Sequence, residues 1–167
     1  RSQCMVNSNE KVNNDYSITK KWGKSVSERG FTQIPIYLLN INRFLKPEFR
    51  LKPTEFIVIL QLVSTWWKAD DNPFPSIATL AARCGVSKRQ VQRSINRLDE
   101  MGFISRNNRK EENMILSNSY NLKPLVSIIN AISEEYPSEY PRKVTISDRE
   151  KISEKIEKTL INTIKSR

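Results

Sequence analysis

The chain has 167 residues, room for one ordinary domain with extensions, and its 28 Lys and Arg outnumber 18 Asp and Glu to give a net charge of +10. This balance favours an acidic partner, either nucleic acid or an anionic membrane surface. The sequence has no histidine, only 4 glycines and no phosphate-binding glycine loop. The commonest general base and metal ligand are therefore missing, so we expect no enzyme and no cofactor.

The two cysteines and the hydropathy pattern indicate neither a zinc site nor a membrane-spanning or secreted protein. Cys4 and Cys84 stand far apart and match no zinc-ligand spacing. Cys84 lies in an apolar helical pattern, where it is expected to pack as a small hydrophobic residue. No apolar stretch approaches the length of a membrane span, and the N-terminal segment carries no apolar core of the kind that a signal peptide has. We expect a reduced, cytoplasmic, nucleoid-associated protein without a membrane or an evident small-molecule ligand.

The N-terminal part of the chain is predicted to be an arm followed by the start of a domain. Residues 1–30 are polar and lack periodicity, which predicts a flexible basic arm with a cluster at Lys20, Lys21 and Lys24. Residues 31–39 are the first with enough apolar content to pack. They are expected to run extended and then form a short helix after Pro35.

A buried helix is predicted from Pro53, because proline suits the first helical position and Glu55 complements the helix N-terminus. The run that follows is apolar on nearly every side, which is typical of a helix in the centre of a core. We expect the helix to end near Ala69, before the breaker cluster at 70–73. The pair Trp66 and Trp67 is expected in the core, the alternative being a base-stacking platform for single strands.

Two further helices are predicted on either side of Gly85. Ser76 caps the first, and Gly85 ends it because a left-handed conformation carries no Cβ penalty there. Ser87 begins the second, helix 88–101, with Gln90 completing a capping box. Ala81, four residues before the glycine, supplies the small contact that a steep helix crossing needs. The spacing predicts a helix-turn-helix, with a helical hairpin of another core as the alternative.

The remainder of the chain is predicted to form a hairpin and two more helices. Residues 103–106 and 114–121 flank a polar loop and indicate a β-hairpin. A helix is expected over 123–135, a proline-bearing linker over 136–145, and an amphipathic helix over 146–167. The apolar stripes of these two helices either pack on the domain or mediate oligomerisation.

The second helix of the predicted pair carries its charges in an order that helix stability does not favour. Acidic residues stabilise the first turn of a helix and basic residues the last. Here Asp99 and Glu100 come last, after four basic residues, which are Lys88, Arg89, Arg93 and Arg97. A polyanion presented to the N-terminal half accounts for this order.

The helical repeat predicts which side chains of helix 88–101 face outward. With Val91, Ile95 and Leu98 inward, a step of about 100° per residue turns a polar set to the opposite side. This set consists of Arg89, Arg93 and Asn96, with Gln92 and Arg97 at its flanks. Arg can bond guanine bidentately, and Gln or Asn can do the same for adenine, so the set suits reading the major groove. The alternative is a solvated basic face.

Contacts with the DNA backbone are expected at the helix N-terminus and in the hairpin. Ser87 and Lys88 stand where that N-terminus would meet a phosphate, although Ser87 is first a cap. In the hairpin, Arg106, Arg109 and Lys110 would reach an adjacent minor groove or phosphates. Two neighbouring acids, at 111 and 112, oppose that prediction.

Residues 31–122 resemble the winged helix-turn-helix domain of many small bacterial, phage and plasmid proteins. The residues that carry the resemblance are FTQIP at 31–35, the helix from Pro53, and PSIATLAARCGVSKRQVQRSINRLDEMGFIS at 75–105. Members include replication initiators and transcriptional regulators of mobile elements. The resemblance covers a little over half the chain and implies a mainly α fold with a small β-hairpin wing. The region from Pro124 onward resembles no family known to us.

Residues and resemblance together predict a sequence-specific double-stranded-DNA-binding protein. The leading role is a transcriptional regulator that occupies a promoter or operator. The alternative is an origin-binding plasmid or phage replication or partition protein, since winged helices serve several roles. A homodimer through the C-terminal helices is expected, because symmetric dimers double the contacts to a short operator.

Overall fold

The computed structural model describes residues 18–107, 110–111, 114–115 and 118–137. The chain divides into two compact units, one ending at Gln33 and one beginning at Ile34. In the first unit, residues 18–22 are helical and helix α2 (Lys24–Ser27) follows. The flexible arm predicted over 1–30 thus contains helical residues at 18–22 and 24–27, and its residues 1–17 lie outside the described residues. Local contacts support α2: the Ser27 hydroxyl donates to the Gly23 carbonyl, and Lys24 forms an ion pair with Glu28 one turn further on.

The second unit begins with short helical turns that lead into the core. Helix α3 (Ile36–Leu39) follows Pro35, as predicted, and the 3-10 turns η1 (Ile41–Arg43) and η2 (Pro47–Phe49) come next. The Asn42 side chain accepts from the Leu51 N–H at 2.8 Å and donates to the Leu51 carbonyl at 2.9 Å. These two bonds close the loop that places the start of the next helix.

Helix α4 (Pro53–Ser64) lies in the core and begins at Pro53, as predicted. It ends five residues before Ala69, where the sequence predicted its end. The hydroxyls of Ser64 and Thr65 donate to carbonyl oxygens of the last turn. Those carbonyls therefore have hydrogen-bond partners without the backbone N–H groups of a further helical turn. The prediction that both tryptophans are in the core is therefore wrong for Trp67, which is 88% exposed, whereas Trp66 packs partly against the core.

Helices α5 (Ile77–Cys84) and α6 (Lys88–Glu100) form the predicted pair. The Ser76 hydroxyl accepts from the Thr79 N–H, and the Ser87 and Gln90 side chains form the predicted capping box. Gly85 has φ 67° and ψ 32°, the left-handed conformation expected after α5. Local capping interactions thus place the two ends of α5 and the beginning of α6.

Replacing Gly85 with alanine should lower the free energy of unfolding by about 1–2 kcal/mol, the cost of a left-handed conformation for a residue with a Cβ. A Cβ at this position has no atom within 4 Å, so the loss would come from the backbone and not from a clash. Chemical denaturation measures it. Gly85→Asn is the matched control, since asparagine tolerates this conformation better and should lose less. An alanine variant as stable as the parent would contradict the assignment.

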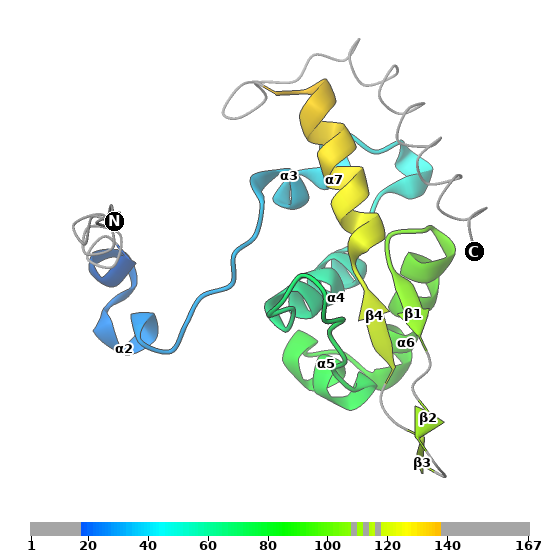
Figure 1. Cartoon of the computed structure of the whole chain (residues 1–167), viewed down its shortest axis with the longest axis horizontal. Coiled ribbons are helices and arrows are strands. Elements are labelled where there is room, and N and C mark those ends of the chain that lie inside the picture. The colour runs from blue at the N-terminus through cyan, green and yellow to red at the C-terminus, as the bar shows by residue number, and fades with distance from the viewer. Residues whose placement is uncertain (1–17, 108–109, 112–113, 116–117, 138–167) are drawn as a thin grey trace, which may run out of the picture. The chain divides into compact units, whose positions relative to one another are not determined.

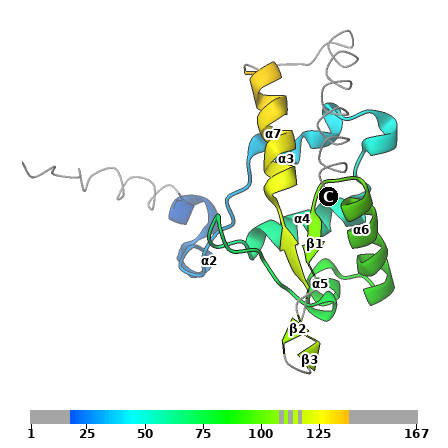
Figure 2. The ribbon, with the colours of Figure 1, turned by 45° about the vertical axis from the view of Figure 1, so that its right-hand side comes forward.

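A small antiparallel hairpin follows α6. Strand β1 (Ser105–Asn107) pairs with β4 (Ser119–Asn121), with Arg106 opposite Tyr120. Nearer the tip, β2 (Lys110–Glu111) pairs with β3 (Met114–Ile115). Figures 1 and 2 show the hairpin extending beyond α5 and α6. The predicted fold class is confirmed: a mainly helical chain with a hairpin directly after the helix pair, the arrangement of a winged helix-turn-helix.

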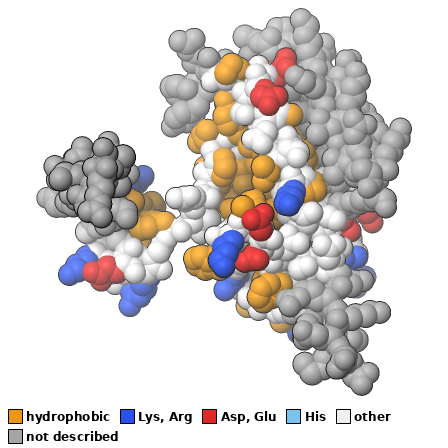
Figure 3. Space-filling view, viewed as in Figure 1, with side chains coloured by type: hydrophobic (Ala, Val, Ile, Leu, Met, Phe, Trp, Pro, Cys, Tyr) orange, Lys and Arg blue, Asp and Glu red, His pale blue; other side chains and the backbone are white. Residues whose placement is uncertain are grey.

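Helix α7 (Lys123–Glu135) continues from β4 and packs beside α3 (Figures 1 and 2). Of its stripe residues, Leu125, Ile128 and Ile132 are at most 2% exposed and Ile129 is partly buried against the core, so the stripe packs within its own unit. The Tyr37 hydroxyl donates to the Tyr136 carbonyl at 2.5 Å and ties the end of α7 to α3. On the face shown in Figure 3, hydrophobic side chains gather over α7 and α4, and the basic side chains are scattered.

Of the two outcomes foreseen for the stripe at 125–132, packing on the domain is the one observed. The predicted linker from 138 onward and the amphipathic helix 146–167 lie outside the described residues, as does Cys4.

Candidate nucleic-acid interface

Helix α6 is held from behind by the core. Val91, Ile95 and Leu98 are each 0% exposed, and they face α4 and α5, the two helices that α6 contacts most. The predicted inward stripe is therefore confirmed. Because these three positions recur at helical spacing, burying them turns the intervening residues to the outside.

The outer face of α6 is polar and cationic at its N-terminal half. Lys88, Arg89 and Arg93 are exposed, whereas Gln92 and Asn96 are half-buried. An open hollow runs along this face, lined by Arg89, Gln92, Arg93, Asn96, Arg97 and Glu100. The outward direction predicted for Arg89, Arg93 and Asn96 from the helical repeat agrees with this lining.

The N-terminus of α6 offers backbone donors to an anion. The Ser87 hydroxyl donates to Gln90 Oε1 at 2.9 Å and accepts the Gln90 N–H at 3.2 Å, so it is engaged as a cap. A helix leaves its first backbone N–H groups without intrahelical acceptors, and the helix dipole places positive potential there. The exposed Lys88 adds a full positive charge at the same place.

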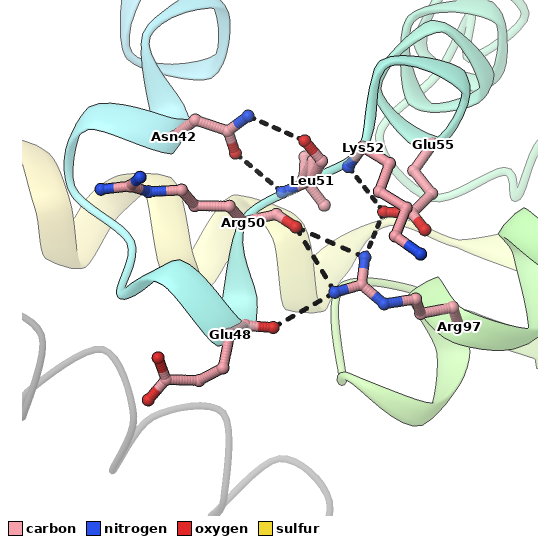
Figure 4. A network of polar contacts seen from close by, with 7 residues as sticks. All are labelled: Asn42, Glu48, Arg50, Leu51, Lys52, Glu55 and Arg97. Carbon is pink, nitrogen blue, oxygen red and sulfur yellow. Dashed lines mark hydrogen bonds and ion pairs between the residues drawn. The ribbon is translucent and has the colours of Figure 1, made fainter.

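Arg97, which also lines the hollow, extends its guanidinium into a polar network (Figure 4). Its guanidinium forms an ion pair with Glu55, a residue that is only 3% exposed, and donates to the carbonyls of Glu48 at 3.1 Å and Arg50 at 3.3 Å. Glu55 also accepts the Lys52 N–H at 2.8 Å. These contacts join α6 to the start of α4 and to the 48–51 segment. Sequence reasoning missed the network, because Arg97 lies more than forty positions from its partners and shares no motif with them.

A second polar cluster joins α6 to the wing. Arg106 Nη1 donates to Asn96 Oδ1 at 3.0 Å, and Gln92 Nε2 donates to the same oxygen at 3.1 Å. The backbone N–H of Arg106 is 3.4 Å from Asp99 Oδ1, which holds β1 against the end of α6. Burial raises the pKa of Tyr120, which lies opposite Arg106, and the guanidinium partly offsets that effect. Three of the predicted DNA-contacting residues thus contact one another.

The other predicted contacts fall at the edge of what the structure describes. Arg109 lies outside the described residues, and Lys110 is described only as part of β2. Lys20, Lys21 and Lys24 are exposed in the first unit.

Within the described ranges, no group of three His, Cys, Asp or Glu side chains could hold a metal ion. In the same ranges, no helix has the length and apolar character that a bilayer crossing needs. Cys84 is a free thiol that packs partly against the core, and burial raises its pKa.

Comparison with known proteins agrees with this geometry. Residues 50–104 match the family model described as a helix-turn-helix domain, a segment that runs from the loop before α4 to the residue before β1. None of the curated proteins matches the chain significantly. The match supports a helix-turn-helix DNA-binding domain, with DNA as the partner.

Proposed function

We propose that this protein is a sequence-specific double-stranded-DNA-binding transcriptional regulator that inserts α6 into the major groove. One observation carries the proposal: α6 exposes Arg89 and Arg93 on the face opposite its buried stripe. Its acidic residues stand at the end, where they do not stabilise the helix. Exposed arginines in the first two turns do not stabilise a solvated helix, whereas they suit a helix that meets phosphates and base edges.

The residues divide into those proposed to read bases and those proposed to bind the backbone. Arg89 and Arg93 suit guanine, and Gln92 and Asn96 suit the edges that an amide recognises. The N-terminus of α6 with Lys88 would bind a phosphate, which sets the register of the helix on the duplex. Arg109 and Lys110 are proposed to bind beside the major groove from the wing.

Arg97 is assigned a different role from the other basic residues of α6. Its guanidinium already has a carboxylate and two carbonyls as partners. A DNA contact would require these bonds to break, so we assign Arg97 to holding α6 in place.

A regulator of this kind is expected to bind as a symmetric dimer. Two copies would place two α6 helices about one turn of DNA apart and protect a short palindrome. Because the stripe of α7 is used within its own unit, we propose that residues 146–167 supply the dimer contacts.

Selection from random duplexes, followed by footprinting on the DNA that flanks the gene, tests the function. A regulator should select one short palindrome and protect it near its own promoter. Protection of clustered direct repeats would indicate the origin-binding role instead. A chain that selects no duplex sequence would contradict the proposal.

Arg93→Ala should weaken binding to the selected site by about 1–3 kcal/mol, the discrimination of one good bidentate contact, and should relax the preference at one base pair. Binding isotherms on the selected site and on its single-base variants measure both effects. Arg83→Ala is the matched control, since Arg83 is exposed on α5, outside the hollow. Equal weakening on all sequences would contradict base readout by Arg93.

A further inference from the structure

The hydrogen bonds between Arg106, Asn96 and Gln92 determine the orientation of two amide groups. A guanidinium has only donors, so the Asn96 atom that Arg106 contacts must be its carbonyl oxygen. That oxygen can only accept, so the Gln92 atom bonded to it must be the NH2 group. One arginine on β1 therefore sets both side chains on α6.

This orientation decides which polar atoms remain for a ligand. Within the described part of the chain, the Asn96 NH2 group and the Gln92 carbonyl oxygen have no hydrogen-bond partner. One N–H of the Gln92 amide is also left to donate to a ligand, because its NH2 group donates only one of its two hydrogens to Asn96. Both side chains line the hollow on the outer face of α6. Asn96 thus offers donors alone, and Gln92 offers an acceptor beside a donor.

We propose that Arg106 is a positioning residue that sets the base preference of Gln92 and Asn96, an inference that rests on the proposed function. Adenine presents an N6 donor beside an N7 acceptor in the major groove, which matches the remaining atoms of Gln92. The donors of Asn96 match acceptors, such as O6 and N7 of guanine or O4 of thymine. Without Arg106, either amide could turn by 180°. Each side chain could then present its NH2 group or its carbonyl oxygen to a base, and the base preference would be lost.

The alternative role of Arg106 is the one that its sequence position suggests, a direct contact from the wing to a phosphate. The two roles differ in their salt dependence. Each phosphate contact releases counterions, so losing one changes the slope of log K against log salt by about 0.9. Losing a positioning residue changes base preference and leaves that slope as it was.

The test compares the parent with Arg106→Met, which removes the donors and keeps most of the side-chain volume. Affinities are measured for the selected duplex, for its single-base variants and for an unrelated duplex, each at several salt concentrations. Gln92→Ala and Asn96→Ala first identify the two base positions concerned. We expect Arg106→Met to reduce discrimination at those positions by about tenfold, the scale of one good bidentate pair, with unchanged affinity for the unrelated duplex.

Two further variants sharpen the result. Arg106→Lys keeps a donor for Asn96 Oδ1 and should retain most of the preference. Asn96→Asp keeps an acceptor for Arg106 and Gln92 but loses its NH2 group, so it should lose the preference at its own position and keep that of Gln92.

The outcomes separate the inference from the function on which it rests. A parent that selects a duplex while Arg106→Met keeps every base preference would overturn the inference alone. So would Arg106→Met binding that weakens equally on all sequences with a shallower salt slope. A parent without any duplex preference would overturn the proposed function and the inference together.

Discussion

Arg97→Met should lower the free energy of unfolding by about 3 kcal/mol, the lower end of the range for breaking a buried ion pair. The substitution leaves the Glu55 carboxylate buried, with the Lys52 N–H as its remaining hydrogen-bond partner among the described residues. The lower end is expected because the Arg97 side chain is itself 27% exposed, so water partly replaces the lost guanidinium. Urea unfolding followed by circular dichroism measures the loss.

A double-mutant cycle shows whether the cost comes from the stranded charge. Glu55→Gln keeps an oxygen for the Lys52 N–H and removes the charge, so Glu55→Gln with Arg97→Met should be more stable than Arg97→Met alone. A double variant as unstable as the single one would contradict the assignment. The salt slope of DNA binding by Arg97→Met should equal that of the parent, because Arg97 is assigned no phosphate.

Ile95→Ala should lower the free energy of unfolding by about 2–5 kcal/mol, the cost of a cavity at a fully buried position. Ile95 is 0% exposed in the middle of α6, where α6 meets α4 and α5. Thermal and urea unfolding measure the effect.

Arg89→Ala, on the opposite face of the same helix, is the control for Ile95→Ala. It should change stability by no more than about 0.5 kcal/mol, as surface substitutions usually do. DNA binding should show the reverse order. Arg89→Ala should bind DNA more weakly than the parent, whereas the folded molecules of Ile95→Ala should bind with an affinity close to that of the parent. A stable Ile95→Ala would mean that α6 is not held from behind as described.

Local structure around the helix pair could be predicted because its determinants lie within a few residues of one another. Ser76, Ser87 and Gln90 cap helix ends through bonds that span three positions. The left-handed Gly85 and the apolar repeat of Val91, Ile95 and Leu98 act over similarly short distances. The end of α4 was predicted too late, because hydropathy does not register the hydroxyl bonds of Ser64 and Thr65.

The amino-acid sequence by itself determined the helix pair on either side of Gly85, the inward and outward faces of α6 and its cationic N-terminal half, since periodicity and capping are short-range. Tertiary structure alone decided which basic residues are already bound. Arg97 meets Glu55 from another helix, and Arg106 meets Asn96 from a strand. Folding also decided that the α7 stripe packs inward. The partner of such a side chain depends on which distant segments of the chain come together in the fold. The spacing of residues along the sequence does not predict these long-range contacts.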